Sequence, residues 1–116
     1  MNNYILGGAV IVIMILLVIA APGKYDNLAQ CLTNSGAKMY GSYWCGHCKD
    51  QKDMFGKSWD KVEYVECSLP NAAGQTPECI EAEIVGYPTW EFASGERVTG
   101  AITFEELGIR TGCPLE

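Results

Sequence analysis

Two cysteines separated by two residues, Cys45 and Cys48, stand where an apolar stretch gives way to a polar one. Residues 37–43 have strand character, and residues 45–55 predict a helix that begins at the first cysteine. Such a strand-to-helix junction holds both sulfurs at the helix N-terminus, where they can close a small disulfide ring. Unpaired backbone N–H groups and the helix dipole favour an anion there, and a protonated His47 acts in the same direction. We therefore expect Cys45 to ionise readily, as a thiol that exchanges with disulfides must.

The 116 residues leave room for one small domain behind an apolar N-terminal segment. Residues 5–21 carry no charge, and their length lies at the low end for a membrane span and above that of most signal-peptide cores. This length and the absence of Lys or Arg before the segment favour an uncleaved anchor, whereas Ala20 and Ala21 favour a cleaved signal. We expect residues 1–22 to form an N-terminal membrane anchor or uncleaved signal, and residues 23–116 to form the domain.

Cysteine content indicates the compartment of the domain better than charge does. Six cysteines in about 95 residues are heavy usage, and an even number suits an oxidising compartment. We expect a single-pass protein of the cytoplasmic membrane, with its catalytic domain on the extracytoplasmic side, whether periplasmic, extracellular or lumenal. The net charge of −6 includes no cluster of Lys or Arg, so no nucleic-acid partner is expected.

Hydrophobic periodicity and turn residues predict the order of the elements. We expect helices over residues 25–33, 45–55, 78–84 and 103–110, strands over residues 37–43, 62–67, 89–92 and 97–99, and loops over residues 57–61 and 68–77. In the second helix residues 49–53 are polar, so Cys48 and Phe55 are placed on its inner face. Gly41, just before the cysteines, predicts a close approach or a bend. The order predicts an α/β fold with a central four-stranded mixed sheet and flanking helices.

The motifs that carry a family resemblance lie about 40 residues apart. Residues 44–48 (WCGHC), the strand before them and residues 86–89 (GYPT) together resemble the thioredoxin superfamily. A more specific resemblance, to the thioredoxin-like domain fused to bacterial and plant vitamin K epoxide reductase homologues, rests on residues 38–41, 51–52, 64–67, 87–91 and 105–107. The resemblance implies a thioredoxin-like fold for residues 23–116. It also implies a stand-alone, membrane-tethered form of the domain, with an integral-membrane vitamin K epoxide reductase homologue as partner.

The resemblance assigns roles to the residues of the dithiol motif. Cys45 is expected to be the nucleophile and Cys48 the resolving thiol, with His47 beside them. The Gly-His pair between the cysteines is the one found in protein disulfide isomerases, which implies oxidation or shuffling of other proteins' thiols. Met39 departs from the pattern, because thioredoxins carry a buried acid six residues before the first cysteine. A thioether cannot relay a proton, so the departure argues against a cytosolic-type reductase.

Three further residues are candidates for substrate binding. The resemblance implies a cis peptide bond at Pro88, which places the backbone of Tyr87 beside the dithiol. There it can hydrogen-bond an extended substrate peptide in the manner of an added strand. Trp44 precedes the dithiol, and the sequence leaves open whether it forms a docking surface or packs in the core. Trp59 and Trp90 are expected to be packing residues.

The other four cysteines allow three pairings once Cys45 and Cys48 form one pair. A Cys67–Cys79 bridge would close the loop over residues 68–77 and contribute about 3 kcal/mol, and a Cys31–Cys113 bridge would contribute about 4–5 kcal/mol. The sequence does not choose among the pairings. An alternative role for Cys67 and Cys79 is a relay that passes electrons to Cys45.

The expected function is that of an enzyme, a thiol-disulfide oxidoreductase. It would oxidise or shuffle protein thiols outside the cytoplasm and be reoxidised by a quinone-linked membrane partner. The alternatives are a disulfide reductase on the same side of the membrane and a disulfide-stapled binding module. A metal-delivery role would need a fourth ligand besides Cys45, His47 and Cys48, so no metal and no cofactor are expected.

Overall fold

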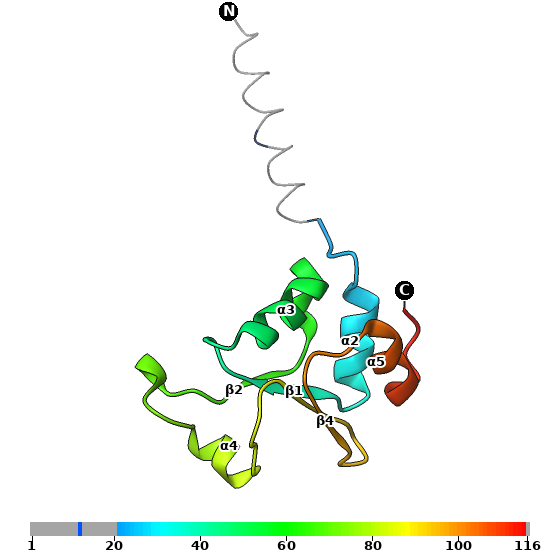
Figure 1. Cartoon of the computed structure of the whole chain (residues 1–116). Coiled ribbons are helices and arrows are strands. Elements are labelled where there is room, and N and C mark those ends of the chain that lie inside the picture. Colours follow the sequence, from blue (N-terminus) through cyan, green and yellow to red (C-terminus); the bar gives the residue numbers. More distant parts are fainter. Residues whose placement is uncertain (1–11, 13–20, 116) are drawn as a thin grey trace, which may run out of the picture.

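Four short strands form one mixed sheet (Figure 1) in the order β2-β1-β3-β4. Strand β1 pairs with β2 in parallel and with β3 in antiparallel orientation, and β3 pairs with β4 in antiparallel orientation. The strands are β1 (Lys38–Gly41), β2 (Tyr64–Glu66), β3 (Thr89–Glu91) and β4 (Arg97–Thr99). The predicted α/β fold with a four-stranded mixed sheet is confirmed.

This computed structural model describes Val12 and residues 21–115. The membrane anchor that the sequence predicts over residues 1–22 therefore falls outside the described residues, apart from Val12 and the last two positions. The part of the chain that is described contains no helix with the length and apolar character of a membrane span.

Helices cover the sheet, and two buried clusters lie on its opposite faces. The helices are α2 (Asp26–Asn34), α3 (Gly46–Phe55), α4 (Pro77–Glu81) and α5 (Phe104–Thr111). The larger cluster joins residues of α2, α3 and α5 to Met39 and Trp90, which pair across β1 and β3 and have no exposed surface. Tyr40, the next residue of β1, belongs to the smaller cluster with Cys67, Cys79 and Ile84. Successive strand residues point to opposite faces, so the two clusters are separated by the sheet.

A buried glutamine ties α3 to the centre of the larger cluster. Gln51 has no exposed surface, and its Oε1 accepts hydrogen bonds from Trp90 Nε1 at 3.1 Å and from the N–H of Ile102 at 2.8 Å. Its Nε2 donates to the carbonyl oxygen of Ile102 at 3.1 Å. The sequence places only Cys48 and Phe55 on the inner face of this helix, so the inward position of Gln51 is a correction. Because all of these polar groups find partners inside the core, burying the amide is tolerated.

Local structure departs from expectation in two segments that the sequence predicts as loops. Residues 57–61 belong to a 3₁₀ helix, η1 (Gly56–Lys61), and residues 68–77 contain a shorter one, η2 (Pro70–Ala72). In η1 the Trp59 ring packs on Phe55 with centroids 5.6 Å apart, and this tertiary contact favours the tight turns. Such short 3₁₀ helices have no periodicity from which the sequence could predict them.

The predicted helix over residues 78–84 is shorter in the structure, where α4 ends at Glu81. Glu83 adopts a positive φ of 57°, and the N–H of Ile84 donates to the carbonyl of Cys79 at 3.0 Å. This turn brings Ile84 into the smaller cluster, where it is 4% exposed. Burial of its side chain favours ending the helix early.

The cap signals of the last helix are confirmed. The side chain of Thr103 accepts a hydrogen bond from the N–H of Glu106 at 3.1 Å, and Gly112 ends α5 in the left-handed conformation with φ 76°. A disulfide then joins Cys113 to Cys31 of α2, with an S–S distance of 2.10 Å. The C-terminal segment is therefore held against the first described helix.

Candidate active site

Cys45 occupies the N-cap position of α3, as the sequence predicts. Its backbone is extended, with φ −82° and ψ 122°, and its Sγ accepts a hydrogen bond from the N–H of Cys48 at 3.3 Å. The side chain is half-buried, so the sulfur remains within reach of solvent. The Cys45 sulfur therefore lies at a helix N-terminus and accepts a backbone hydrogen bond there.

Cys48 lies one turn into the same helix in a different environment. Its residue is 1% exposed, and both cysteines are present as free thiols. Burial is the largest cause that raises the pKa of Cys48 to about 12, and a hydrogen bond with Cys45 adds to it. A backbone hydrogen bond from Ser42 and the charge of Lys52 act in the opposite direction. The accessible sulfur is therefore that of Cys45, while Cys48 stays protonated at neutral pH.

The backbone of β1 approaches the buried sulfur closely at Gly41, which confirms the close approach that this glycine predicts. A Cβ atom on Gly41 would lie 3.0 Å from Cys48 Sγ and 3.0 Å from Cε2 of the Tyr64 ring. Both contacts are shorter than van der Waals separation, so no larger residue fits without movement of the dithiol. Glycine at this position therefore sets how deeply Cys48 can be buried.

Strand β2 places the Tyr64 ring beside the dithiol and the Glu66 carboxylate next to the Tyr64 hydroxyl. Tyr64 and Glu66 are two residues apart and share one face of the strand, and the Tyr64 hydroxyl donates to Glu66 Oε1 at 3.1 Å. Glu66 pairs with Gly41 in the register of the sheet. Burial, followed by the charge of Glu66, raises the pKa of Tyr64. The Nζ of Lys52 lies 4.1 Å from the centre of the Tyr64 ring, where its charge is attracted to the ring face.

The sequence did not predict Tyr64 or Glu66 as residues of this candidate site. Met39 stands at the position where thioredoxins carry a buried acid. In the structure Met39 is fully buried in the larger, apolar cluster. The carboxylate on this side of the sheet comes instead from the neighbouring strand. Alternation along residues 62–67 could have shown that Tyr64 and Glu66 share a face, but only the strand order places that face beside Cys48.

The loop before β3 faces the dithiol through its backbone. The Tyr87–Pro88 peptide bond is cis, as predicted, and Pro88 is fully buried. The Sγ of Cys45 donates to the carbonyl oxygen of Tyr87 at 3.7 Å. The sequence separation of these two residues is 42, so the contact depends entirely on the fold.

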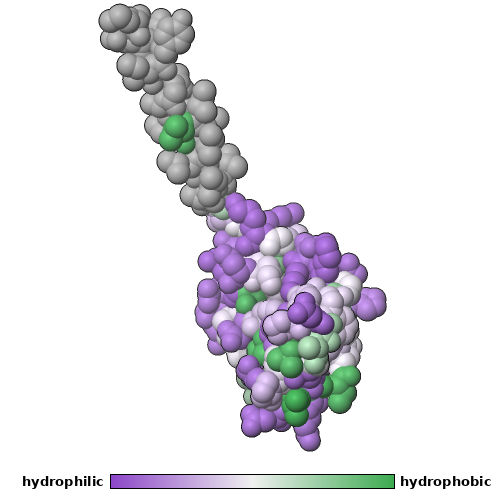
Figure 2. Space-filling view, turned by 90° about the vertical axis from the view of Figure 1, so that its left-hand side faces the viewer, coloured by the Kyte–Doolittle hydropathy of each residue, from purple (hydrophilic) through white to green (hydrophobic). Residues whose placement is uncertain are grey.

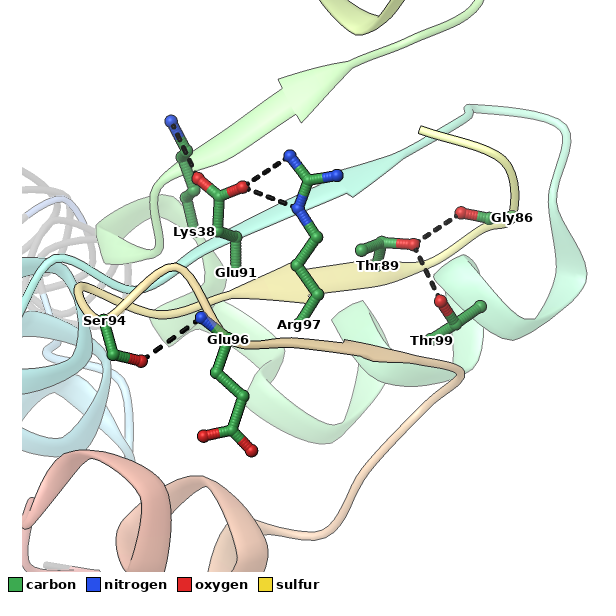
Figure 3. Close-up of polar contacts among 8 residues, drawn as sticks. All are labelled: Lys38, Gly86, Thr89, Glu91, Ser94, Glu96, Arg97 and Thr99. Carbon is green, nitrogen blue, oxygen red and sulfur yellow. Dashed lines mark hydrogen bonds and ion pairs between the residues drawn. The ribbon is translucent and has the colours of Figure 1, made fainter. Parts of the chain in front are cut away.

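A side chain of the β3–β4 hairpin hydrogen-bonds the loop that precedes β3 (Figure 3). The Thr89 hydroxyl donates to the carbonyl of Gly86 at 2.7 Å and lies 3.2 Å from the Thr99 hydroxyl. The N–H of Gly100 donates to the carbonyl of Pro88 at 2.7 Å. At the other end of the hairpin Glu91 pairs with Lys38 of β1 and with Arg97 of β4. Hydrogen bonds to the carbonyls of Gly86 and Pro88, the residues on the two sides of Tyr87, thus hold the segment that carries the Tyr87 carbonyl.

Among the tryptophans, Trp44 alone has a largely exposed side chain. It is 55% exposed, and its ring meets Tyr87 edge-on with centroids 5.9 Å apart. Its Nε1 donates to the Ser68 hydroxyl at 2.9 Å. This places Trp44 on the surface, which was one of the two alternatives, whereas Trp59 packs against Phe55 and Trp90 is fully buried, as predicted.

The remaining candidates lie around this centre. The side chain of His47 is 80% exposed, and its Nδ1 lies 4.0 Å from Asp50 Oδ2. Within residues 21–115, no three His, Cys, Asp or Glu side chains are grouped so that they could hold a metal ion. Cys67 and Cys79 form a disulfide with an S–S distance of 2.05 Å, and neither residue has exposed surface. Of the three pairings that the sequence allows, the structure contains Cys31–Cys113 with Cys67–Cys79.

Comparison with known proteins agrees with the chemistry of this centre. No family model matches the chain. Over 94 residues the chain is 40% identical to thiol-disulfide oxidoreductase LTO1 of Arabidopsis thaliana, and the match covers 77% of this chain and 24% of that protein. The chain thus spans about a quarter of the length of this relative. The likeness supports a thiol-oxidoreductase-like domain.

Proposed function

We propose that residues 23–116 form a thioredoxin-like domain that oxidises or shuffles the thiols of other proteins through Cys45 and Cys48. The observation that carries the proposal is the asymmetry of the two sulfurs. Cys45 is accessible and receives a backbone hydrogen bond at a helix N-terminus, whereas Cys48 is buried beneath it. One sulfur is thus suited to attack by a partner thiol, and the other to closing the ring from within. The name of the Arabidopsis relative, a thiol-disulfide oxidoreductase, supports the same chemistry.

The oxidation of a substrate dithiol takes two exchange steps. A substrate thiolate attacks Sγ of Cys45 in the oxidised pair, the Cys45–Cys48 bond breaks, and the Cys48 sulfur leaves and takes up a proton. The second substrate thiolate then attacks the substrate sulfur bound to Cys45, and Cys45 leaves as a thiolate. Two electrons pass from the substrate to the pair. Burial of Cys48 favours its protonated form, and the N–H of Cys48 is placed to hydrogen-bond the Cys45 sulfur as it leaves.

Reoxidation of the pair needs a disulfide-bearing partner. We propose that this partner is an integral-membrane vitamin K epoxide reductase homologue linked to quinone, and that the domain is tethered to the cytoplasmic membrane by residues 1–22. What supports this partner is the resemblance of residues 38–41, 64–67 and 87–91 to domains fused to such enzymes. The thiolate of Cys45 would attack the partner's disulfide, and Cys48 would then close the ring and release the reduced partner.

The two other disulfides support an extracytoplasmic position and a structural role for themselves. Disulfides persist in oxidising compartments and are rare in the cytosol. Cys67 and Cys79 have no exposed surface and lie in the smaller cluster, across the sheet from Cys48. Exchange requires direct attack of one sulfur on another, so a bond buried on the opposite face is poorly placed to relay electrons to Cys45.

The redox potential of the pair tests the direction of electron flow. The chain is equilibrated with mixtures of reduced and oxidised glutathione, and the fraction of the Cys45–Cys48 disulfide is measured by alkylation and mass. We expect a potential well above roughly −270 mV, the value of thioredoxin, and Cys45→Ser should abolish oxidation of a reduced unfolded protein. A potential near that of thioredoxin would favour the alternative reductase. A Cys45 thiol that does not react with glutathione would favour the stapled binding module.

A further inference from the structure

A single loop contacts three aromatic side chains close to the reactive sulfur. We call residues 68–78, which lie between Cys67 and Cys79, the stapled loop. Three hydrogen bonds join it to the aromatic rim, a name used here for Tyr43, Trp44 and Tyr87. These bonds are Trp44 Nε1 to Ser68 Oγ at 2.9 Å, the Ala72 N–H to the Tyr43 hydroxyl at 2.8 Å, and Gln75 Nε2 to the Tyr87 hydroxyl at 2.8 Å. Ser68, Ala72 and Gln75 of the stapled loop thus each form a hydrogen bond with one residue of the aromatic rim.

Two residues of the aromatic rim, Tyr43 and Trp44, are exposed next to Cys45, and the third, Tyr87, is half-buried beside them. Tyr43 and Trp44 precede Cys45 in the chain and are each 55% exposed, and the Tyr87 carbonyl accepts from the Cys45 thiol. Val85, two residues before Tyr87, is 98% exposed. Figure 2 shows apolar side chains at the surface among polar ones on the side of the molecule where α4 and η2 lie in Figure 1. A molecule that reaches Cys45 therefore meets aromatic and aliphatic side chains.

The stapled loop is itself held firmly at the two residues that bind Trp44 and Tyr87. Ser68 and Gln75 face each other in an isolated β-bridge. The N–H of Ser68 donates to Glu66 Oε2 at 2.9 Å, and Gln75 Nε2 also donates to the carbonyl of Ile84 at 2.8 Å. The Cys67–Cys79 disulfide closes the loop just outside this bridge.

These contacts close a ring of four residues. Ser68 and Gln75 are joined by the bridge, each binds one aromatic ring, and the rings of Trp44 and Tyr87 meet at 5.9 Å. An exposed aromatic side chain that is held in one orientation before binding loses less conformational entropy when a partner docks. Rigid aromatic residues of this kind are the usual anchors of binding surfaces.

We propose that the stapled loop positions the aromatic rim to bind an extended polypeptide with an apolar side chain next to its reactive cysteine. Ser68 and Gln75 are the positioning residues, and they act through Trp44 and Tyr87. The choice of occupant follows from the surface, since an apolar rim beside a sulfur and a backbone carbonyl suits an extended chain that pairs through its backbone. This inference rests on the proposed thiol-exchange function, and what it adds is the positioning role of Ser68 and Gln75 and the preference for an apolar side chain beside the reactive cysteine.

The test compares a peptide with a small dithiol as substrates of the whole chain, with oxidised glutathione present at a fixed saturating concentration to return the Cys45–Cys48 pair to the disulfide after each turnover. The peptide carries two cysteines with a Leu or Phe beside the first, and the small dithiol is dithiothreitol, which cannot span the rim. In the Ser68→Ala, Gln75→Ala double variant we expect the KM for the peptide to rise roughly threefold to tenfold. The kcat for the peptide and the rate with dithiothreitol should not change. A Gln30→Ala, Ser94→Ala variant makes the same changes at exposed positions outside the loop and should match the parent.

A second pair of peptides tests the apolar preference directly. Replacing the Leu or Phe beside the cysteine with Ser should raise the KM of the parent, and the double variant should no longer distinguish the two peptides. An unchanged KM in the double variant, or an equal loss of rate with dithiothreitol, would overturn the positioning role. Failure of the underlying thiol-exchange function is distinguished from this, because the parent chain itself would then react with neither substrate.

Discussion

The sulfur of Cys48 lies against the backbone of Gly41, so closely that a Cβ atom there would come within 3.0 Å of it. The same Cβ would lie 3.0 Å from the Tyr64 ring, so an added methyl group would press on two side chains at once. The depth at which the Cys48 thiol is buried, and hence its protonation, is therefore set by a residue of the adjacent strand as well as by the helix that carries it.

Gly41→Ala should destabilise the domain because it overpacks this contact. We expect a loss of about 1–3 kcal/mol in the free energy of unfolding, measured by urea denaturation. The matched control is Gly46→Ala inside the dithiol motif, where a Cβ would meet nothing within 4 Å. Equal stability of the two variants would show that the structure places the Cys48 sulfur too close to β1.

The reduced domain should lose stability at alkaline pH on account of Cys48. Its pKa is raised in the folded state from 9.0 to about 12, mainly by burial, so the unfolded chain releases this proton at lower pH than the folded one. The contribution of Cys48 is thus complete below pH 9 and decreases as the pH rises towards 12. Urea unfolding of the reduced protein and of Cys48→Ser from pH 7 to 11 measures it. The difference between them should shrink as the pH rises, and a constant difference would contradict the burial of the thiol.

Cys48→Ala should accumulate mixed disulfides with substrate proteins on Cys45, because the intramolecular thiol that resolves them is gone. Non-reducing electrophoresis after incubation with a reduced unfolded protein detects these adducts. Cys45→Ala is the control and should form almost none, since the remaining thiol is 1% exposed. Comparable trapping by the two variants would contradict the assignment of Cys45 as the nucleophile.

Loss of the Cys31–Cys113 disulfide should lower stability without changing the redox centre. The bridge closes a separation of 82 residues, for which chain entropy predicts a contribution of about 4–5 kcal/mol. The Cys31→Ala, Cys113→Ala double variant should therefore unfold at a much lower urea concentration. Its Cys45–Cys48 potential in glutathione buffers should match that of the parent at a temperature where both are folded. A shifted potential would mean that this bridge also influences the dithiol.

Gln51→Leu should lower the free energy of unfolding by more than an ordinary substitution in a helix of this size. It leaves the N–H groups of Trp90 and Ile102 without acceptors in the core, and we expect a loss of about 2–4 kcal/mol by urea denaturation. Gln30→Leu is the control, because Gln30 is exposed on α2 and bonds only to Asn34 one turn away among the hydrogen bonds described here. A small effect at Gln51 would show that water can enter and satisfy these groups.

Much of the local structure follows from short-range signals. The strand that ends at the dithiol, the helix that begins there, the β3–β4 hairpin and the Thr103 cap are all confirmed close to their predicted positions. The cis bond at Pro88 follows from the Tyr-Pro-Thr segment and its family resemblance. These features depend mainly on residues that are neighbours in the sequence. The conformational preferences of such residues do not depend on the tertiary fold.

The sequence by itself determined the order of elements and the position of Cys45 at a helix start, because backbone geometry over a few residues decides them. Only the tertiary structure decided which cysteines pair, that Gln51 turns inward, that Tyr64 lies beside Cys48, and that Ser68 and Gln75 hydrogen-bond Trp44 and Tyr87. Each of these depends on which strands become neighbours and how closely they approach. Residues far apart in the chain come into contact only when the sheet and its two clusters form together. A local sequence pattern therefore does not predict those contacts.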